Sequence, residues 1–453
     1  MDITRTPCDL QVTEASQAIH DGELSSAGLV ESCLERIDRI EKKIQAWALI
    51  DREGALKTAC DLDKELANGK NRGPLHGIPF GIKDIFYTDG LRTESGSKVC
   101  AGYVPAYDAT VIRRLKNAGA VILGKTHTTE FALFDAAPTG NPWNVEHTPG
   151  GSSSGSGAAV AAGMCPAALG SQTLGSVLRP ASYNGIVGFK PHYGRISTFG
   201  VVPLSWTFDH VGIFSRSVED CALIFQSIAG YDSQDLHSLD KSIPECLGQL
   251  KTARPPRIGL ARQYFYDYAG DEMRTQTDKC ADLFRQAGAK VEDITLPDSF
   301  AEIFENGLII MKVEAAASHT KMFAAHKEQL SPKIRAFIEE GLSFGGTEYA
   351  QALRRRSQQI ADMEPLLYEF DAVMTPGAPD APPKGLKNTG SPIMQGPWTI
   401  LGVPTINLPA GLNRNGLPMG IQLASPPLAE VFLFSAAHWC EDLLNFQFRP
   451  HID

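Results

Sequence analysis

The sequence predicts an α/β fold in which helices cover both faces of a sheet, and two observations carry this prediction. Segments with apolar residues at helical spacing alternate along the chain with short apolar runs that are typical of buried strands. No internal repeat divides the 453 residues, and no Pro/Gly linker long enough to mark a domain boundary interrupts the helices at about 299–369. We therefore expect one domain over 1–453 with a helical insertion, rather than three independent domains.

The first segment of the chain, about 1–70, is predicted to be helical, and a core at about 71–230 follows it. The expected N-caps are Ser25 or Ser26 for one helix and Asp108 for another, since short polar side chains satisfy free N–H groups there. The elements expected up to residue 170 are helices over 26–40 and 52–66, a strand over 77–82, a helix over 108–115, a strand over 120–124, and a buried helix, turn and short strand within 157–170.

The C-terminal part continues this alternation and contains the helical insertion at about 299–369. The expected elements are a strand over 257–260, a helix over 271–287, a strand at 290–291, the inserted helices, strands over 371–374, 405–408 and 419–423, and a helix over 428–444.

Composition excludes several classes of protein. A formal net charge of −10 argues against a nucleic-acid-binding face, so we expect no nucleic-acid partner. The nine cysteines form no CxxC pair, and no histidine has metal-ligand spacing, so we expect no metal site and no cofactor. The run 157–170 is too short for a membrane span and contains Pro166. Without a signal-peptide pattern, we expect a cytoplasmic protein with no membrane partner.

The Gly/Ser-rich segment 150–157 admits three interpretations. A flexible linker is disfavoured because a helix-forming Ala/Val run follows at once. A phosphate loop would need lysine where Ser156 stands. A nucleophile elbow centred on Ser153 would need a strand before it, but the preceding residues include two prolines, and the required histidine has only the weak candidate pair Asp209–His210.

The segment 149–191, PGGSSSGSGAAVAAGMCPAALGSQTLGSVLRPASYNGIVGFKP, resembles the signature segment of the amidase signature family. The other landmarks of the family occur in order at 77–84, 140–144, 370–376 and 402–405. The resemblance covers nearly the whole chain. It implies an amidase-signature fold with a central mixed, twisted sheet covered by helices on both faces.

The resemblance also implies the catalytic residues. The lysine of the family corresponds to Lys83, the bridging serine to Ser152 and the nucleophile to Ser176, and 24 residues separate the two serines as in the family. The bridging serine of the family follows a cis peptide bond. The candidates for the oxyanion hole are the backbone N–H groups of Thr173, Leu174, Gly175 and Ser176.

This chemistry is physically reasonable. A serine hydroxyl is a weak nucleophile until a base takes its proton, and lysine is a base only when it is neutral. Burial at the end of an apolar strand can lower the lysine pKa by ~3 units, which corresponds to about 4 kcal/mol. Ser152 can pass the proton between Lys83 and Ser176, because a hydroxyl both donates and accepts.

Two positions depart from the pattern of many relatives. Leu174 stands where many have glycine, and a left-handed backbone there would cost about 1–2 kcal/mol. Arg179 lies three residues after the nucleophile, whereas the A subunits of tRNA-dependent amidotransferases usually place an arginine two residues after it. Arg179 either binds a substrate carboxylate or braces the loop.

These observations favour a stand-alone amidohydrolase, similar to malonamidase-type enzymes, that cleaves a small amide through an acyl-enzyme on Ser176. The chain also lacks the Arg-Arg-Ile-x-x-Gly segment that is typical of the A subunits; 333–338 occupies the comparable region. The expected partners are a small-molecule amide substrate and, as one option, a second copy of the chain in a homodimer. The alternatives are a glutamine-hydrolysing A subunit of a tRNA-dependent amidotransferase, and a binding or scaffold protein that has lost the chemistry.

Overall fold

The computed structural model describes residues 5–133, 135–250 and 254–452. Within these residues eleven strands form one sheet in the order β1-β3-β2-β4-β6-β5-β10-β11-β9-β7-β8. The strands are β1 (Trp47–Ile50), β2 (Pro79–Lys83), β3 (Val121–Thr126), β4 (Ala167–Gln172), β5 (Val187–Lys190), β6 (His210–Ser215), β7 (Arg257–Ala261), β8 (Lys290–Ile294), β9 (Ala372–Pro376), β10 (Thr405–Leu412) and β11 (Pro418–Ala424).

The sheet is mixed. The pairs β2–β3, β2–β4, β7–β8 and β7–β9 are parallel, whereas β4, β6, β5, β10, β11 and β9 follow one another in antiparallel order. The predicted α/β class with a mixed sheet between helices is confirmed. Strands β1, β5 and β6 were not predicted: β1 and β5 have only four residues each, and β6 has a histidine, a glycine and a serine among its apolar residues.

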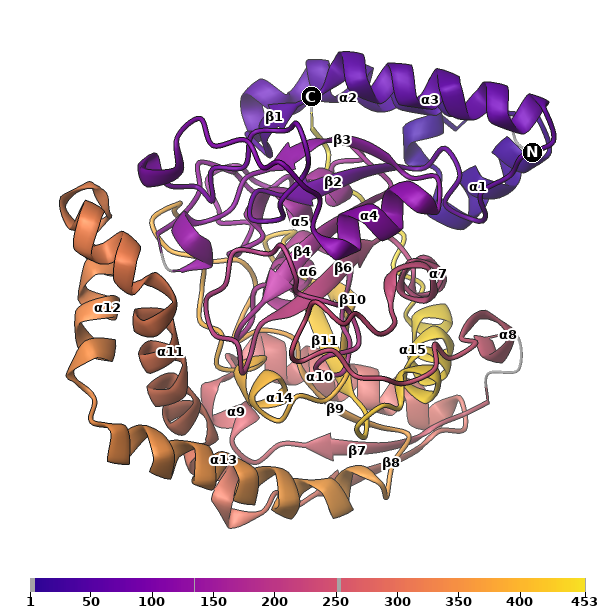
Figure 1. The fold of residues 1–453 in the computed structure, drawn as a ribbon. Coiled ribbons are helices and arrows are strands. Elements are labelled where there is room, and N and C mark those ends of the chain that lie inside the picture. The colour runs from indigo at the N-terminus through magenta and orange to yellow at the C-terminus, as the bar shows by residue number, and fades with distance from the viewer. Residues whose placement is uncertain (1–4, 134, 251–253, 453) are drawn as a thin grey trace.

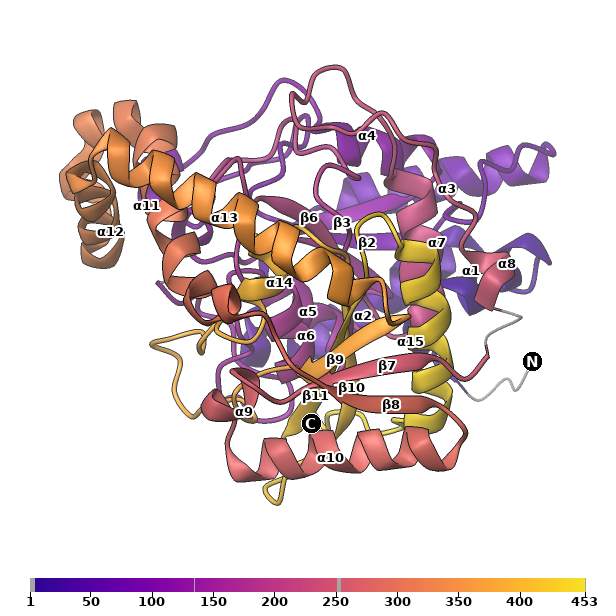
Figure 2. The same ribbon diagram turned by 90° about the horizontal axis from the view of Figure 1, so that it is seen from below.

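Helices lie on both faces of the sheet. Figure 1 shows α2 and α3 over the β1 end, and Figure 2 shows α10 and α13 on opposite sides of β7 and β9. The longer helices are α1 (Val12–His20), α2 (Ser26–Ile44), α3 (Arg52–Ala67), α4 (Thr110–Asn117), α5 (Ser154–Ala161), α6 (Leu178–Asn184), α7 (Val218–Ile228), α10 (Asp271–Gln286), α11 (Ile303–His326), α12 (Pro332–Ser343), α13 (Gly346–Leu367) and α15 (Glu430–Leu444). The short helices are α8 (Leu247–Leu250), α9 (Phe265–Tyr268) and α14 (Gly396–Ile400).

The two predicted N-caps had different outcomes. Ser25 caps α2, and its side chain accepts a hydrogen bond from the Gly28 N–H at 3.0 Å. The prediction for Asp108 was wrong: α4 begins one residue later than expected, so its N-cap is Ala109. The Asp108 carboxylate instead accepts from Lys116 Nζ at 2.8 Å, in the last turn of the same helix.

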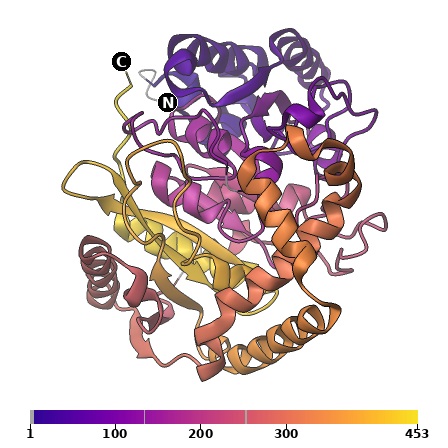
Figure 3. The same ribbon diagram turned by 90° about the vertical axis from the view of Figure 1, so that its left-hand side faces the viewer.

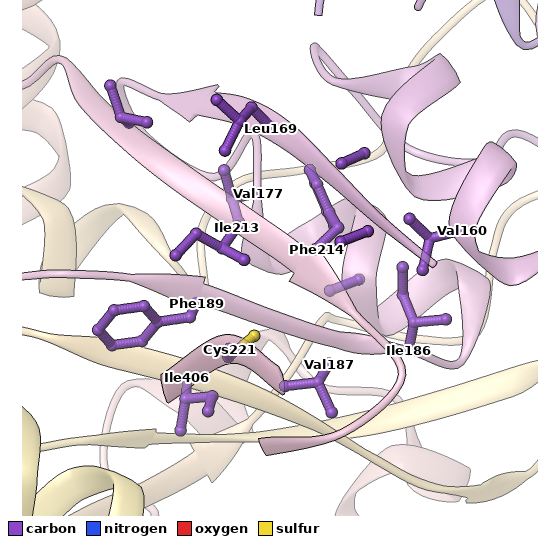
Figure 4. Packing of buried hydrophobic residues seen from close by; sticks show 14 of the residues in the cluster. Val160, Leu169, Val177, Ile186, Val187, Phe189, Ile213, Phe214, Cys221 and Ile406 are labelled. Carbon is purple, nitrogen blue, oxygen red and sulfur yellow. The ribbon is translucent and has the colours of Figure 1, made fainter. Parts of the chain in front are cut away.

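The apolar core at the centre of the sheet supports the strands that bear the candidate site. Figure 4 shows Leu169 of β4, Phe214 of β6, Phe189 of β5 and Ile406 of β10 packed together, with Val177 from the loop after β4 beside them. All five side chains are buried. Each contributes about 1.5–3 kcal/mol by burial, so this region holds the end of β4 in a fixed place.

The helical insertion, α11, α12 and α13, lies along one side of the molecule (Figures 1 and 3). Its three helices pack on one another and return the chain to the sheet at β9. We propose that the chain is one domain, and the continuous sheet, with strands drawn from residues 47 to 424, supports this proposal. Among the described residues, no helix has the length and apolar character needed to cross a membrane.

Candidate active site

A buried lysine and two serines from different segments meet at one edge of the sheet. Strands β2 and β4 run parallel with Ile82 opposite Leu169, so both end at the same edge. Lys83, the last residue of β2, is fully buried. Its Nζ donates to Ser152 Oγ at 2.7 Å and to Ser171 Oγ at 2.7 Å. The structure therefore brings two of the three predicted catalytic residues into direct contact.

Two adjacent glycines allow the backbone to place Ser152 beside the lysine. Gly150 has φ 80°, which residues with a side chain rarely adopt. A Cβ at Gly151 would lie 2.6 Å from Thr389 Cγ2, so only glycine permits this close approach. The Gly151–Ser152 peptide bond is cis, as the family resemblance implies. The Ser152 carbonyl accepts from the Thr129 N–H at 3.2 Å, which fixes the segment to the loop after β3.

Ser176 lies in the loop between β4 and α6, beyond the same edge of the sheet. The side chain of Gln172 closes this loop, because its Oε1 accepts from the Val177 N–H at 2.8 Å and the Leu178 N–H at 3.0 Å. Ser176 itself is 9% exposed. In the described part of the chain its hydroxyl makes no hydrogen bond with protein, so it is available to react.

The backbone before Ser176 offers free hydrogen-bond donors. No oxygen among the described residues accepts from the N–H groups of Leu174, Gly175 or Ser176. The Leu174 carbonyl is held by the Thr399 hydroxyl at 2.7 Å, which fixes the orientation of the following peptide unit. Three adjacent N–H groups without internal acceptors are suited to stabilising a developing oxyanion.

Leu174 does not strain this loop. Its φ is not positive, so the left-handed penalty considered from the sequence does not arise. Its side chain is buried. A Cβ at Gly396 of α14 would lie 3.9 Å from Leu174 Cδ2 and 2.6 Å from Phe304 Cδ2, so Leu174 packs near Phe304 of α11. The helical insertion thus reaches the nucleophile loop.

Burial sets the proton affinity of Lys83. Removal from water lowers the pKa of its amine to about 7, and the negative charge of Asp209 opposes this effect. Asp209 also accepts a hydrogen bond from Thr173 Oγ1 at 2.6 Å. A large fraction of the Lys83 amines is consequently neutral at physiological pH, as a general base must be.

Arg179 is buried in the first turn of α6 and has donors to spare. Its Nη2 donates to the Gly151 carbonyl at 2.6 Å and to Thr389 Oγ1 at 3.1 Å. Its Nε and Nη1 are buried and meet no acceptor in the residues that the structure describes. Burial lowers the pKa of Arg179 to about 10, which leaves the guanidinium charged at neutral pH. It therefore braces the peptide before Ser152 and keeps two N–H directions open.

The alternative nucleophile, Ser153, is occupied. Its Oγ donates to the Ser171 carbonyl at 3.2 Å and accepts from the Ser171 N–H at 3.3 Å. The candidate His210 is directed elsewhere, with Nδ1 bonded to the Phe208 carbonyl at 2.6 Å. A Ser-His-Asp triad centred on Ser153 is not assembled.

The sequence analysis missed two polar contacts of the site, Ser171 and Thr389, and it considered Asp209 only as a triad partner of His210. Ser171 left a signal, since it is a polar residue within a strand of otherwise small and apolar residues. Asp209 also left one, because it directly precedes a buried strand. Thr389 left none: it meets Arg179 across 210 residues of sequence, and local patterns do not report such contacts.

Comparison with known proteins agrees with this geometry. The model of the family described as Amidase matches residues 28–434. The chain belongs to the amidase signature family. This amidase is accordingly an enzyme of the class that acts on carbon–nitrogen bonds other than peptide bonds, and a Ser-Ser-Lys triad is characteristic of the family.

Curated relatives of the amidase are A subunits of amidotransferases. The A subunit of the glutamyl-tRNA(Gln) amidotransferase of Geotalea daltonii is 35% identical, over 97% of this chain and 98% of the relative. The protein of the same name from Desulforudis audaxviator is 36% identical, over 93% of each chain.

Solved structures with the same fold include amidases. The native peptide amidase of Stenotrophomonas maltophilia has a TM-score of 0.85 and 28% identity, over 98% of this chain and 99% of that one. A structure described as a vestigial protein complex, which reveals the evolutionary origins of an s-triazine catabolic enzyme, has a TM-score of 0.90 and 27% identity, over 98% and 100%.

One prediction from composition is wrong. We expected no nucleic-acid partner, because the net charge is −10. The names of the curated relatives include a tRNA, glutamyl-tRNA(Gln), and these relatives match nearly the full length of the amidase. Net charge describes a whole chain, whereas one chain of a larger enzyme can act on tRNA through an assembly whose other chains supply the positive surface.

Proposed function

We propose that the amidase hydrolyses an amide through an acyl-enzyme on Ser176, with Ser152 as the proton relay and Lys83 as the base. The observation that carries this proposal is the 2.7 Å hydrogen bond between Lys83 Nζ and Ser152 Oγ in a fully buried setting. Two further observations support the proposal. The hydroxyl of Ser176 is open, and the bond from Arg179 to the Gly151 carbonyl ties the turn after Ser176 to the peptide before Ser152.

The reaction balances in two half-reactions. Neutral Lys83 takes a proton through Ser152 from Ser176, whose Oγ attacks the amide carbon. The N–H groups of Thr173, Leu174, Gly175 and Ser176 are the proposed donors to the oxyanion. As the C–N bond breaks, the proton returns to the leaving nitrogen, which departs as ammonia or an amine. Water, deprotonated through the same relay, then attacks the ester carbon. The C–O bond to Ser176 breaks, the carboxylic acid leaves, and Ser176 regains its proton.

Ser176→Ala tests the nucleophile. Turnover of every amide that the parent hydrolyses should fall by at least about 10⁴-fold, because the proposed acyl-enzyme forms on the Ser176 hydroxyl, which alanine lacks. Ser153→Ala is the matched control from the same region and should lose less than about tenfold. Ammonia release under saturating substrate measures both. Near-parental turnover by Ser176→Ala would eliminate Ser176 as the nucleophile.

For the substrate, we propose the activity of an amidotransferase A subunit: release of ammonia from the side-chain amide of glutamine for transfer to a tRNA-bound acceptor. Relatives with that name, 32–36% identical across nearly the whole chain, support this hypothesis over the stand-alone enzyme expected from the sequence. The Arg179 guanidinium, with two unfilled buried donors, suits a substrate that carries a carboxylate, as glutamine does.

A stand-alone hydrolase of small amides, carbamates or esters is the second candidate. The peptide amidase and the other amidase structures with the same fold support it. One experiment distinguishes the two candidates. Ammonia release from glutamine and from a panel of small amides is measured for the chain purified alone and for the chain co-expressed and purified with the products of adjacent genes. Glutamine hydrolysis that depends on a co-purifying chain favours the amidotransferase, and panel activity of the isolated chain favours the second candidate.

Arg179→Met tests carboxylate recognition. The kcat/KM for a carboxylated amide should fall about 10–100-fold more than for its neutral isostere, since a charge-assisted hydrogen bond is lost only with the former. Thr389→Val is the control, because it removes one partner of Arg179 but keeps the guanidinium. In this variant kcat/KM should change by the same factor for both substrates. Equal losses for both substrates in Arg179→Met would limit Arg179 to bracing the loop.

We also propose a cytoplasmic location. In the described residues all nine cysteines are free thiols, and seven of them are buried, which suits a reducing compartment.

A further inference from the structure

We propose that Asp209 is a positioning residue of the amidase: its carboxylate faces the Lys83–Ser152 pair as the counter-charge and holds the oxyanion loop through Thr173. Asp209 directly precedes β6, and Gln172 of β4 lies opposite His210 in the antiparallel ladder. Thr173 and Asp209 are therefore the next pair beyond the end of the ladder. Their side chains meet, with Thr173 Oγ1 donating to Asp209 Oδ1 at 2.6 Å.

Strand alternation places this carboxylate on the same side as the lysine. Residues two apart in an extended backbone point to the same face, so Thr173, the first residue after β4, continues the face that Ser171 occupies. Lys83 Nζ meets Ser171 Oγ at 2.7 Å on that face. We infer that the Asp209 carboxylate, which meets Thr173, lies on the same side as the amine; its negative charge raises the pKa of Lys83.

The second oxygen of the carboxylate is fixed by backbone and by the helical insertion. Asp209 Oδ2 accepts from the Leu204 N–H at 2.7 Å and the Ser205 N–H at 3.0 Å. Ser205 Oγ in turn donates to Glu314 of α11 at 2.6 Å. The carboxylate cannot turn away from Thr173 without breaking bonds on both oxygens, so its charge has a defined direction.

Other titratable groups also face Asp209. Glu314 of α11 and Tyr193 interact with it electrostatically, and Arg356 of α13 faces both of those groups. Burial raises the pKa of Asp209 to about 6, while the bonds from Thr173 and the two N–H groups lower it. The carboxylate is consequently mostly ionised at neutral pH, where the lysine must accept a proton.

The inference rests on the proposed function, because it concerns the proton that Lys83 takes from Ser176. That transfer creates an ammonium in a buried site, and a fixed carboxylate on the same face of the sheet lowers the free energy of the charged product. Without Asp209 the amine would be a weaker base.

Asp209→Asn tests the charge with little change of shape. The amide oxygen can accept from the two N–H groups while the NH₂ donates to Thr173. The hydrogen bonds therefore persist and only the negative charge is lost. The pH dependence of kcat/KM is measured, together with the rate at which a fluorophosphonate labels Ser176. We expect the acid-side midpoint of the kcat/KM profile to move down by about one pH unit, because Lys83 becomes easier to deprotonate. The plateau of kcat/KM should fall about tenfold, because the amine is then a weaker base.

Two further variants separate charge from structure. Thr173→Val removes the hydroxyl but keeps the carboxylate, so it should lower the plateau and move the midpoint by much less than Asp209→Asn does. Asp209→Glu keeps the charge, so its midpoint should stay near that of the parent, and it carries the test if Asp209→Asn does not fold. A parental midpoint in Asp209→Asn, or a shift in Asp209→Glu as large as in Asp209→Asn, would overturn the inference. Labelling that persists in Ser176→Ala would instead refute the proposed function itself.

Discussion

At the scale of single residues, the proposed chemistry depends on one amine that burial keeps partly neutral. Lowering the pKa of Lys83 from 10.5 to about 7 corresponds to about 5 kcal/mol of lost preference for the charged form. Two hydroxyls, those of Ser152 and Ser171, replace the water that a lysine normally keeps. The same burial that makes the base useful therefore reduces the stability of the folded protein.

Lys83→Met should consequently change activity and stability in opposite directions. Turnover should fall by at least about 10³-fold. The unfolded lysine binds its proton up to pH 10.5 but the folded one only to about 7, so the parent is destabilised below pH 10.5 and fully so below pH 7. We expect the variant to gain about 1–3 kcal/mol at pH 7 in urea unfolding. In the parent, activity should rise with pH through about 7; a loss of stability in Lys83→Met would contradict this account.

At the scale of elements, the helical insertion acts on the site through a buried carboxylate. Glu314 of α11 is fully buried and accepts from Ser205 Oγ at 2.6 Å, from the Thr207 N–H at 3.0 Å, from the Thr207 hydroxyl, and from Tyr349 OH of α13 at 2.8 Å. The loop that it holds leads directly to Asp209. Hydrogen bonds thus join two helices of the insertion, α11 and α13, to the segment before β6.

Glu314→Met tests this connection. A thioether is only a weak acceptor, so the bonds to the loop 204–208 are lost and kcat should fall about 10-fold with a smaller change in KM. Tyr349→Phe is the matched control: it removes a single bond from the other side of the carboxylate and should cost less than about 1 kcal/mol with kcat nearly unchanged. Similar kcat losses in both variants would mean that the insertion acts through general stability.

At the scale of the whole molecule, long-range polar bonds join the N-terminal helices to the centre of the sheet. Asp220 of α7 is fully buried and accepts from the Val12 N–H at 3.0 Å and the Thr13 N–H at 2.9 Å, more than 200 residues away. Arg216 donates to the Cys165 carbonyl at 3.1 Å and the Cys8 carbonyl at 3.3 Å. These bonds make the first segment of the chain part of the same folded unit.

Asp220→Ala should destabilise that unit without altering the site. The variant leaves two N–H groups at the start of α1 without acceptors, so we expect a loss of about 2–4 kcal/mol in urea unfolding. At a temperature where the variant remains folded, kcat/KM should stay within about twofold of the parent, since Asp220 contacts none of the site residues. Two separate unfolding transitions, rather than one at lower urea, would contradict the proposal of a single domain.

Local patterns were sufficient for the parts of the fold and site that depend on neighbouring residues. Apolar spacing located most helices and strands, and the apolar run before Lys83 indicated a buried amine. Local patterns misplaced the N-cap of α4, because a cap depends on which residue takes the first helical conformation and not on side-chain type alone.

Residue patterns alone predicted the α/β class, and the resemblance to the amidase signature family predicted the family and the residues proposed as base, relay and nucleophile. The folded structure was needed to show that Lys83 also meets Ser171, that Asp209 meets Thr173, and that Arg179 has two buried N–H groups without acceptors. The register between β4 and β6 and the path of a distant loop create these contacts. Such pairings depend on packing across the whole chain, which no local pattern encodes.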